Sequence, residues 1–530
     1  MMRRVLMAVL LVGCGGAGST GAGGGAPTAC ADHQRELGEG ECVAVGVTAC
    51  AEGFVSDAAG GCDPILPEEN CSDGRMALPG ETSCRALMDC GSGRWGNIPL
   101  EPGTLYVDQA APSGGDGSEA APFASVLAAV AAANDGGMIA IAEGTYVGDV
   151  PVTGKAVRLW GRCPDQVTLV GDGTTGLALS FTSSFGSELH GVSVTGPGVG
   201  VSIAASEVTI DGVRIHDTGS FGFDAESLVA GVSGTQAFVS NLLVEHATAV
   251  GFHVVEASVV ADGIVVRDTE PTASGTAGRG INVQGETFDT MVQIDRCVVE
   301  RHHEAGVAVA DQPLTMHGCV VRDTDVTVAT GSEGRGISVQ AGVLSLSGSV
   351  VERHVEYGIF AAAGSAITVD QTVVGGTESS PISGRHGSGI SLQRSDGDVR
   401  DSLLADHRDF GVIVFDGALT LTNGIVRDVA VAADGRFGDG VSAARDVAST
   451  SVVVSASIVE RSARAGLSSF GAVSQIADSS LRCNPVALNG EDLGNDAFAF
   501  EDLGGNACAC GDEVGTCKVQ SAGLEPPSAP

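Results

Sequence analysis

The chain has 530 residues, 78 of them glycine, and a formal net charge of −37. An acidic surface of this size repels phosphate backbones, which argues against nucleic-acid binding, and it disfavours acidic polysaccharides unless divalent cations bridge the two. Hydrophobic residues make up 43% of the chain but aromatic residues only 4%. The apolar content therefore comes from Val, Ile, Ala and Leu, which suits short β-strands better than long helices.

The N-terminus has the order of residues expected of an export signal. Two basic residues, Arg3 and Arg4, precede an apolar stretch over residues 5–12 that is too short to span a bilayer. It leads into Leu11-Val12-Gly13-Cys14, which resembles the bacterial lipobox, where cleavage before the cysteine leaves a lipid-modified N-terminus. The alternative is an ordinary secretory signal with an incidental cysteine.

The lipobox resemblance implies a signal peptide over 1–13, lipidation of Cys14 and anchoring of the chain to a membrane. Gly15 follows the cysteine, and for lipoproteins this favours the outer membrane or cell surface. Residues 14–29 are rich in glycine and would form a flexible tether.

The remaining cysteines form two clusters, which in an exported protein predict disulfides. A small disulfide module is expected over 30–100, because so short a segment with few large apolar side chains needs covalent links. A metal site there would need Cys-x-x-Cys pairs, which are missing. The first cluster is Cys30, Cys42, Cys50, Cys62, Cys71, Cys84 and Cys90.

Seven is an odd number, so one cysteine of this cluster needs a partner elsewhere, and Cys163 is the nearest. The second cluster comprises Cys483, Cys508, Cys510 and Cys517, for which three pairings stay open. It predicts a C-terminal cap over 483–518, followed by a disordered tail over 519–530.

Two motifs recur between the clusters. The first starts at Val244, Val299, Val351, Leu404 and Val459, at separations of 55, 52, 53 and 55 residues, and a glycine always follows seven residues later. The second interleaves with it and starts at Val266, Val321, Val374 and Val426. A fixed period of this kind marks a solenoid or a propeller. A propeller needs aromatic signatures in register, and only two Trp and three Tyr occur.

Residues 122–134 predict a helix, because Phe123, Val126, Leu127 and Val130 have helical spacing and Gly136 follows. Together with the glycine-punctuated strands that come next, this resembles the opening of the pectin-lyase-like right-handed parallel β-helix families, in which the helix caps the first coil. The predicted fold class is therefore all-β: a right-handed parallel β-helix over 101–482 with an N-terminal capping helix, preceded by the disulfide-rich module.

The resemblance leaves the activity open, since this fold hosts both enzymes and non-catalytic surface proteins. No catalytic residue is predicted: the chain has no Asp-Asp pair, and Lys155 and Lys518 are its only lysines. Two rows of repeated polar residues are expected on the outside. They are solvated rows or, alternatively, binding sites for carbohydrate or Ca²⁺. The rows are His302, His354 and His407, and Asp268, Asp323 and Asp428.

Two further repeated features concern structure. Gln284, Gln340 and Gln393 are expected to form a ladder along the coils. Cys297 and Cys319 head equivalent strands and either form a disulfide or stack as small buried side chains.

The sequence predicts a lipid-anchored, non-catalytic scaffold that binds glycans or envelope and surface proteins, with no cofactor unless Ca²⁺ is required. The alternative is a carbohydrate-active enzyme of the pectin-lyase-like fold, a lyase or hydrolase. Clustered carboxylates in one groove would favour the enzyme.

Overall fold

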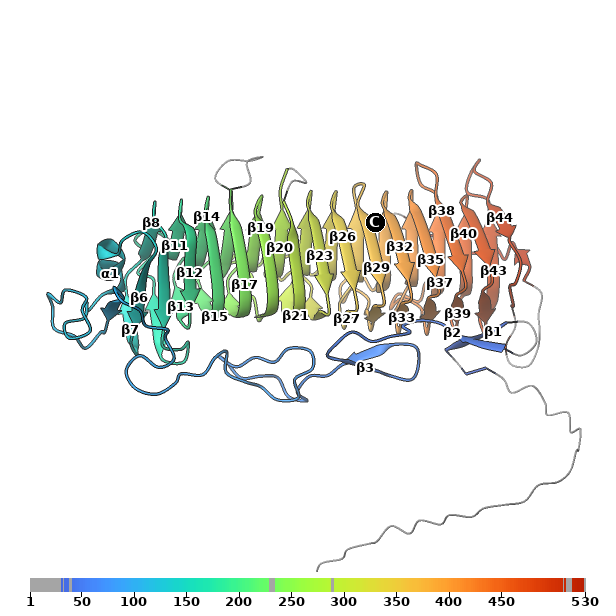
Figure 1. The fold of residues 1–530 in the computed structure, drawn as a ribbon. Helices are drawn as coiled ribbons and strands as arrows, with labels where there is room; N and C mark the ends of the chain where they lie inside the picture. The colour runs from blue at the N-terminus through green and yellow to red at the C-terminus, as the bar shows by residue number, and fades with distance from the viewer. Residues whose placement is uncertain are drawn as a thin grey trace, which may run out of the picture.

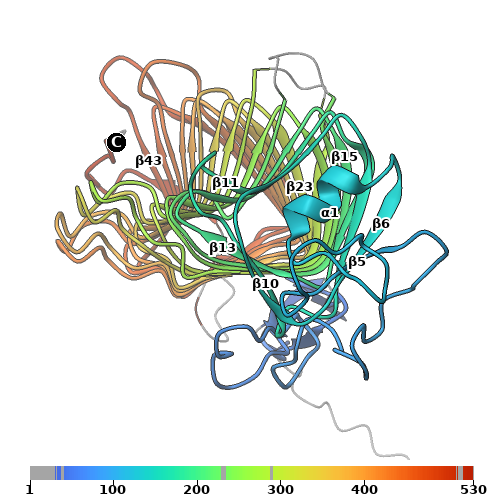
Figure 2. The ribbon, with the colours of Figure 1, turned by 90° about the vertical axis from the view of Figure 1, so that its left-hand side faces the viewer.

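The computed structural model describes residues 30–31, 33–37, 41–227, 234–286, 290–508, 510 and 517–528. The predicted signal peptide, tether and lipidation site at Cys14 lie outside them. The fold class predicted from the sequence is confirmed: parallel strands stack coil upon coil into one long β-helix (Figure 1). Viewed from its N-terminal end, the coils lie behind one another around a common core (Figure 2). No helix among the described residues is long and apolar enough to cross a membrane.

Most coils contribute one strand to a 15-stranded parallel sheet, called here the groove sheet. In stacking order its strands are β8 (Val150–Thr153), β11 (Leu177–Thr182), β14 (Val199–Ala204), β16 (Phe223–Glu226), β18 (Val250–Val255), β20 (Arg279–Gln284), β22 (Ala305–Ala310), β25 (Arg335–Gln340), β28 (Tyr357–Ala362), β31 (Ser388–Gln393), β34 (Phe410–Phe415), β37 (Asp439–Ala444), β40 (Ala465–Phe470), β43 (Val486–Glu491) and β45 (Val519–Gln520).

The rest of each coil belongs to a bent 26-stranded sheet. Its strands are β5 (Leu105–Val107), β6 (Gly137–Ile141), β7 (Gly144–Val147), β9 (Val157–Gly161), β10 (Val167–Val170), β12 (Phe185–His190), β13 (Ser193–Gly196), β15 (Glu207–Thr218), β17 (Gln236–Ala247), β19 (Ser258–Arg267), β21 (Val292–His303), β23 (Pro313–His317), β24 (Val320–Asp325), β26 (Val343–Ser347), β27 (Val350–Glu352), β29 (Ala366–Asp370), β30 (Val373–Gly375), β32 (Asp396–Arg400), β33 (Leu403–Ala405), β35 (Ala418–Thr422), β36 (Ile425–Arg427), β38 (Ser451–Ser455), β39 (Ile458–Glu460), β41 (Val473–Ala477), β42 (Ser480–Arg482) and β44 (Ala499–Asp502).

The two sequence motifs occupy alternate coils of one stack. Val244 pairs with Val266, Val266 with Val299, and this single inward column continues through both motifs to Val459. The glycines stack beside it for a steric reason. A Cβ added at Gly336 would lie 2.6 Å from the carbonyl oxygen of Gly358, so no side chain fits where successive coils approach.

The N-terminal end is closed by α1 (Val126–Ala132), which turns Val126, Ala129 and Val130 into the core. It is shorter than predicted. The Ser125 side chain accepts a hydrogen bond from the Ala128 N–H and begins the helix there. Pro122 and Phe123 precede it in extended chain, where Phe123 bridges to Val107, and Leu127 is 46% exposed.

The disulfides predicted for the module over 30–100 are present, but residues 41–100 do not fold as a separate unit. They lie along the side of the β-helix as an extended strap, blue in Figure 1. β1 (Gln34–Leu37) precedes the strap and pairs with its first strand, β2 (Glu41–Ala44), and β3 (Phe54–Ser56) pairs with β4 (Cys62–Pro64). The strap runs against the stacking direction: Val45 packs on Ile458 near the last coils, and Trp95 on Met138 near the first.

The disulfides explain why the strap has no core of its own. Three of them close loops of only 12 or 13 residues, namely Cys30–Cys42, Cys50–Cys62 and Cys71–Cys84. The apolar side chains of the strap therefore pack on the β-helix, as Met76 and Leu78 do against Val265 and Val298. Cys90 pairs with Cys163 in the first coils, the partner that the odd cysteine count indicated.

The C-terminal end contains the disulfides Cys483–Cys510 and Cys508–Cys517. The chain then returns to the β-helix. β45 pairs with β43, and residues 521–528 continue along the groove sheet. The prediction of a disordered tail over 519–530 is thus wrong for 519–528, because Glu491 and Asn489 hold the backbone of this segment through hydrogen bonds. Residues 529–530 lie outside the described residues.

Candidate functional site

A continuous groove runs over the outer face of the groove sheet, and its two sides are built differently. On alternate coils a long loop leads into the sheet, at residues 268–278, 326–334, 376–387 and 428–438. These loops support one another: the Ala329 N–H donates to the Gly275 carbonyl over 2.8 Å, and the Asp434 N–H to the Gly384 carbonyl over 2.9 Å. Together they form a wall along the groove.

The groove consists of three adjoining hollows. The first is lined by Arg279 and Arg335. The second shares Arg335 with the first, and it shares Tyr357 and His386 with the third, which extends to Phe437. The third has a volume of about 300 Å³. From β20 to β37 the groove crosses seven strands, a length of about 29 Å at the spacing of neighbouring strands.

A repeated glycine frame places the wall side chains. Where each long loop joins its strand, the sequence is x-Gly-y-Gly, in which x and y vary and both glycines are constant. The residue at x has positive φ in all four loops. These residues are Ala277, Glu333, His386 and Phe437, with φ of 60°, 69°, 66° and 58°. The positions y begin the strands β20, β25, β31 and β37 and are Arg279, Arg335, Ser388 and Asp439. The glycines stay constant while x and y change, so the groove changes chemistry along its length. It is charged near β20 and aromatic near β37.

Aromatic rings gather at the third hollow. The rings of Phe410 and Phe437 lie 5.1 Å apart between centroids, and those of Tyr357 and Phe360 likewise 5.1 Å. Two guanidinium groups lie near the ring of Phe437, with Arg436 at 5.1 Å and Arg464 at 4.9 Å from its centre. The Tyr357 hydroxyl lies 2.7 Å from Nδ1 of His386. Burial lowers the pKa of His386 and raises that of Tyr357, so both groups are neutral and the phenolic hydroxyl donates a hydrogen bond to Nδ1 of the imidazole.

The short turns between the long loops carry a row of acids, Glu304, Glu356 and Asp409. The first two are satisfied: Glu304 binds Nε of Arg279 over 2.6 Å, and Glu356 accepts the N–H of Glu333 over 2.9 Å. Asp409 differs because the corresponding position y is Ser388 rather than arginine, and its side chain is one methylene shorter. Its buried Oδ1 has no hydrogen-bond partner.

Asp409 is consequently a carboxyl group of raised pKa that lines the third hollow. Burial raises the pKa of this carboxyl to about 7, and the neighbouring carboxylates of Asp434 and Asp439 act in the same direction. Arg464 lowers the pKa of Asp409 only in part, because its guanidinium forms an ion pair with Asp439, with Nε 2.7 Å from Oδ1. The hollow thus combines aromatic faces, planar cations and a buried carboxyl group that takes up a proton near neutral pH.

The aspartate row predicted from the repeat lies outside this groove. Asp268, Asp323 and Asp428 each face an arginine of the following coil, namely Arg301, Arg353 and Arg461, at 2.6 to 2.7 Å. The hydrogen bond from Arg461 lowers the pKa of Asp428. With both oxygens engaged by guanidinium nitrogens, these carboxylates are not free ligands for Ca²⁺, and the alternating charge forms a structural lattice.

The histidine row is not an outward row, as the sequence suggested, but faces the core. His302, His354 and His407 are each 1% exposed, and Nε2 of each lies 3.1 Å from a backbone carbonyl. Burial lowers their pKa values to about 3, 4 and 4. Threonines occupy the same column on the coils between them, where Thr324 pairs with His302. These histidines are core residues and take no part in the groove.

Two other expectations concern neighbouring columns. Gln284, Gln340 and Gln393 do not form a ladder, because Ala310 and Ala362 stand between them in the register. Cys297 and Cys319 do form a disulfide across adjacent coils.

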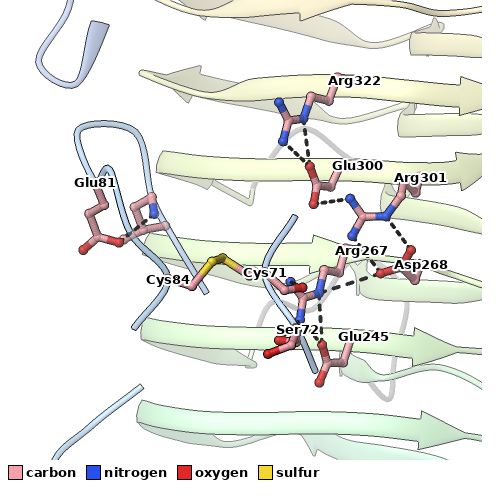
Figure 3. The surroundings of a disulfide bond; sticks show 11 residues. Cys71, Ser72, Glu81, Cys84, Glu245, Arg267, Asp268, Glu300, Arg301 and Arg322 are labelled. Carbon is pink, nitrogen blue, oxygen red and sulfur yellow. Dashed lines mark hydrogen bonds and ion pairs between the residues drawn. A yellow bond between two sulfur atoms is a disulfide. The ribbon is translucent and has the colours of Figure 1, made fainter. Parts of the chain in front are cut away.

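Beneath the strap lies a buried ion-pair network (Figure 3). Glu245 accepts from Nε of Arg214 at 2.7 Å, Nε of Arg267 at 3.0 Å and the Gly74 N–H at 2.8 Å. Arg267 also donates to the carbonyls of Cys71 and Ser72, each at 3.0 Å. Asp73 and His246 approach Glu245 closely enough to share a cation, but the two arginines already neutralise this carboxylate. The network fastens the strap to the β-helix.

Comparison with known proteins gives likeness of fold. No family model and no curated protein matches the chain. Among solved structures, pectate lyase Pel9A is 16% identical, with 61% of this chain and 78% of that chain covered and a TM-score of 0.38. The A-module of mannuronan C-5 epimerase AlgE6 from Azotobacter vinelandii is 12% identical over 72% and 94%, with a TM-score of 0.37. The N-terminal fragment of bacteriophage Phi29 gene product 12 is 11% identical over 70% and 67%, with a TM-score of 0.46.

Proposed function

We propose that this protein binds a neutral oligosaccharide in the groove over β20 to β37. The observation that carries the proposal is the third hollow, where ring faces of Tyr357, Phe410 and Phe437 combine with charged groups of both signs. An apolar surface with a few placed polar groups is the usual make-up of a small-ligand site. The net charge of −37 favours a neutral over an acidic glycan.

A glycan array with the soluble chain beginning after Gly25, run with and without Ca²⁺, tests this proposal. The strongest ligand is then titrated calorimetrically against Phe437→Ala and against Phe238→Ala. Phe238 is also exposed, at 44%, but lies on β17 of the other sheet. We expect Phe437→Ala to weaken binding about tenfold or more, the usual loss for a central aromatic contact, and the control to leave it unchanged. Binding to no glycan, or equal effects of the two variants, would refute the assignment.

A second candidate function is glycan cleavage, and Asp409 favours it. A general acid is most effective when its pKa lies near the working pH, and a pKa of about 7 meets this condition. If the bound glycan is cleaved, Asp409→Asn should lower turnover about 100-fold or more while binding persists. Asp323→Asn is the matched control, because that carboxylate lies outside the groove. Lack of turnover over the whole panel leaves the binding function and removes the catalytic one.

We further propose that lipidation of Cys14 anchors the protein to the outer membrane or cell surface, which would place the groove in contact with envelope glycans. The support is the order of basic residues, apolar stretch, Gly13 and Cys14 in the sequence. In cells, wild-type protein should fractionate with membranes and Cys14→Ser with the soluble fraction. Mass spectrometry of the mature N-terminus should show the acyl chains, and an unmodified cysteine would contradict the anchor.

A further inference from the structure

The last described residues of the chain lie in the groove itself. From β45 the chain passes back over β43, β40 and β37, opposite to the direction in which the coils stack. The start of this segment is fixed by side chains of β43: the Ala522 N–H donates to Asn489 Oδ1 over 3.1 Å, and the Gly523 N–H to Glu491 Oε1 over 2.7 Å. The segment has no sheet partner beyond β45, so these side chains replace backbone pairing.

The middle of the segment contacts the aromatic end of the groove. Leu524 packs on the apolar cluster formed by Phe410, Phe415 and Phe470. Glu525 follows, and its side chain lies 3.3 Å from a guanidinium nitrogen of Arg436. Its backbone carbonyl accepts a hydrogen bond of 2.9 Å from Arg464. These are the two arginines whose guanidinium groups lie near the ring of Phe437.

The segment ends at the third hollow and forms part of its wall. Pro527 is buried and, with Ser528, lines the same cavity as Tyr357 and Asp409. Two consecutive prolines keep the chain extended and lower the entropy that a free segment loses on docking. An extended strand of about seven residues reaches roughly 22 Å, enough to cross the coils between β43 and β34.

We infer that residues 522–528 are a built-in peptide ligand of the groove, which occupies its aromatic end and competes with an external ligand for that end. The inference deepens the proposed function and rests on it for the identity of the competitor. The peptide site itself is independent: it consists of the Phe410–Phe415–Phe470 surface for leucine, the Arg436–Arg464 pair for glutamate, and the third hollow for proline.

The experiment compares the full chain with a truncated chain that ends at Ser521. A labelled synthetic peptide with the sequence of residues 522–530 should bind the truncated chain and not the full chain, where the attached copy holds the site at a high effective concentration. A peptide carrying Leu524→Ala and Pro527→Ala should bind the truncated chain at least tenfold more weakly. Circular dichroism and thermal unfolding verify that the truncated chain keeps its fold.

The glycan found on the array is then titrated against both chains. If the attached segment leaves the site open one-tenth of the time, the truncated chain should bind that glycan about tenfold more tightly. The substitution Glu525→Gln in the full chain tests the same point without truncation and should give a smaller gain. Equal glycan affinity of truncated and full chains overturns the competition while the proposed function stands. Peptide binding without any glycan binding overturns the proposed function and keeps the peptide site.

Discussion

The three buried histidines should make the β-helix lose stability in mildly acidic solution. His354 shows why: Nδ1 accepts the backbone N–H of Thr324 at 3.3 Å, while Nε2–H donates to the Val321 carbonyl. A second proton on Nδ1 would face a donor inside a column without water access. Asn484 makes the same two contacts further along the column, accepting from the Ser462 N–H and donating to the Val459 carbonyl. His354→Asn therefore removes the titrating group and keeps the hydrogen bonds.

The expected magnitude follows from linkage. The unfolded histidine has a pKa near 6.5, whereas burial holds that of folded His354 at about 4. Below pH 6.5 the unfolded chain binds a proton that the folded chain refuses, so stability falls as the pH decreases toward 4. Between about pH 7.5 and pH 5 each such histidine removes about 2 kcal/mol. The pKa values of His302 and His407 are lowered to about 3 and 4, so the three histidines together reduce the free energy of unfolding by about 6 kcal/mol over this pH range.

The assay is guanidinium unfolding followed by circular dichroism at both pH values, for wild type, His354→Asn and the exposed-histidine control His317→Asn. We expect His354→Asn to reduce the acid-induced loss by about 2 kcal/mol and His317→Asn to leave it unchanged. Histidine ring NMR shifts give the pKa of His354 directly. A ring that titrates near 6.5, or an equal acid-induced loss in wild type and His354→Asn, would refute the reasoning.

Three further outcomes are expected from single sites. Glu245→Gln should cost about 3–5 kcal/mol in guanidinium unfolding, because the buried Arg267 and the partly exposed Arg214 lose their carboxylate, whereas Glu333→Gln on the groove rim should cost little. Gly336→Ala should cost about 1–3 kcal/mol by overpacking against Gly358, and Gly234→Ala, with open space around it, should not. Cys90→Ser with Cys163→Ser should speed proteolysis of the strap; unchanged cleavage would show that its packing alone secures it.

The sequence predicted the β-helix because its repeat satisfies a backbone requirement on every coil. Val299 and Val321 carry different neighbours, yet both must fill the same inward column, and the glycines seven residues after the first motif mark where coils approach most closely. Side-chain direction was harder to predict. Where the strand bends into the next turn, period-2 alternation breaks down, so the sequence pattern places His302 on the surface although its ring lies in the core.

The groove residues escaped sequence analysis because they are the ones that do not repeat. Repetition singles out Asp268 and Asp323, which form ion pairs with arginines of the following coil. Phe437 and His386 occupy the same position of the repeat with different side chains, and only the constant glycines that follow them identify this position in the sequence. The positions of the strap and the C-terminal segment could not be predicted for another reason. Both pack on coils that are distant in sequence, and local composition does not indicate such contacts.

The two-coil period also determines how a ligand must lie. Long loops recur on every second coil, so the side chains at position x stand about 10 Å apart along the groove, with the acids of the short turns between them. A polymer lying along the axis meets successive x positions, whereas one lying across it would meet only one. Affinity should therefore rise with oligosaccharide length and level off once the ligand spans about 29 Å, the distance from β20 to β37.

Titration of an oligosaccharide length series measures this dependence of affinity on length. It is performed on the truncated chain so that the peptide does not shorten the groove. An affinity that is already maximal for a disaccharide would place the whole site in the third hollow and refute the axial arrangement.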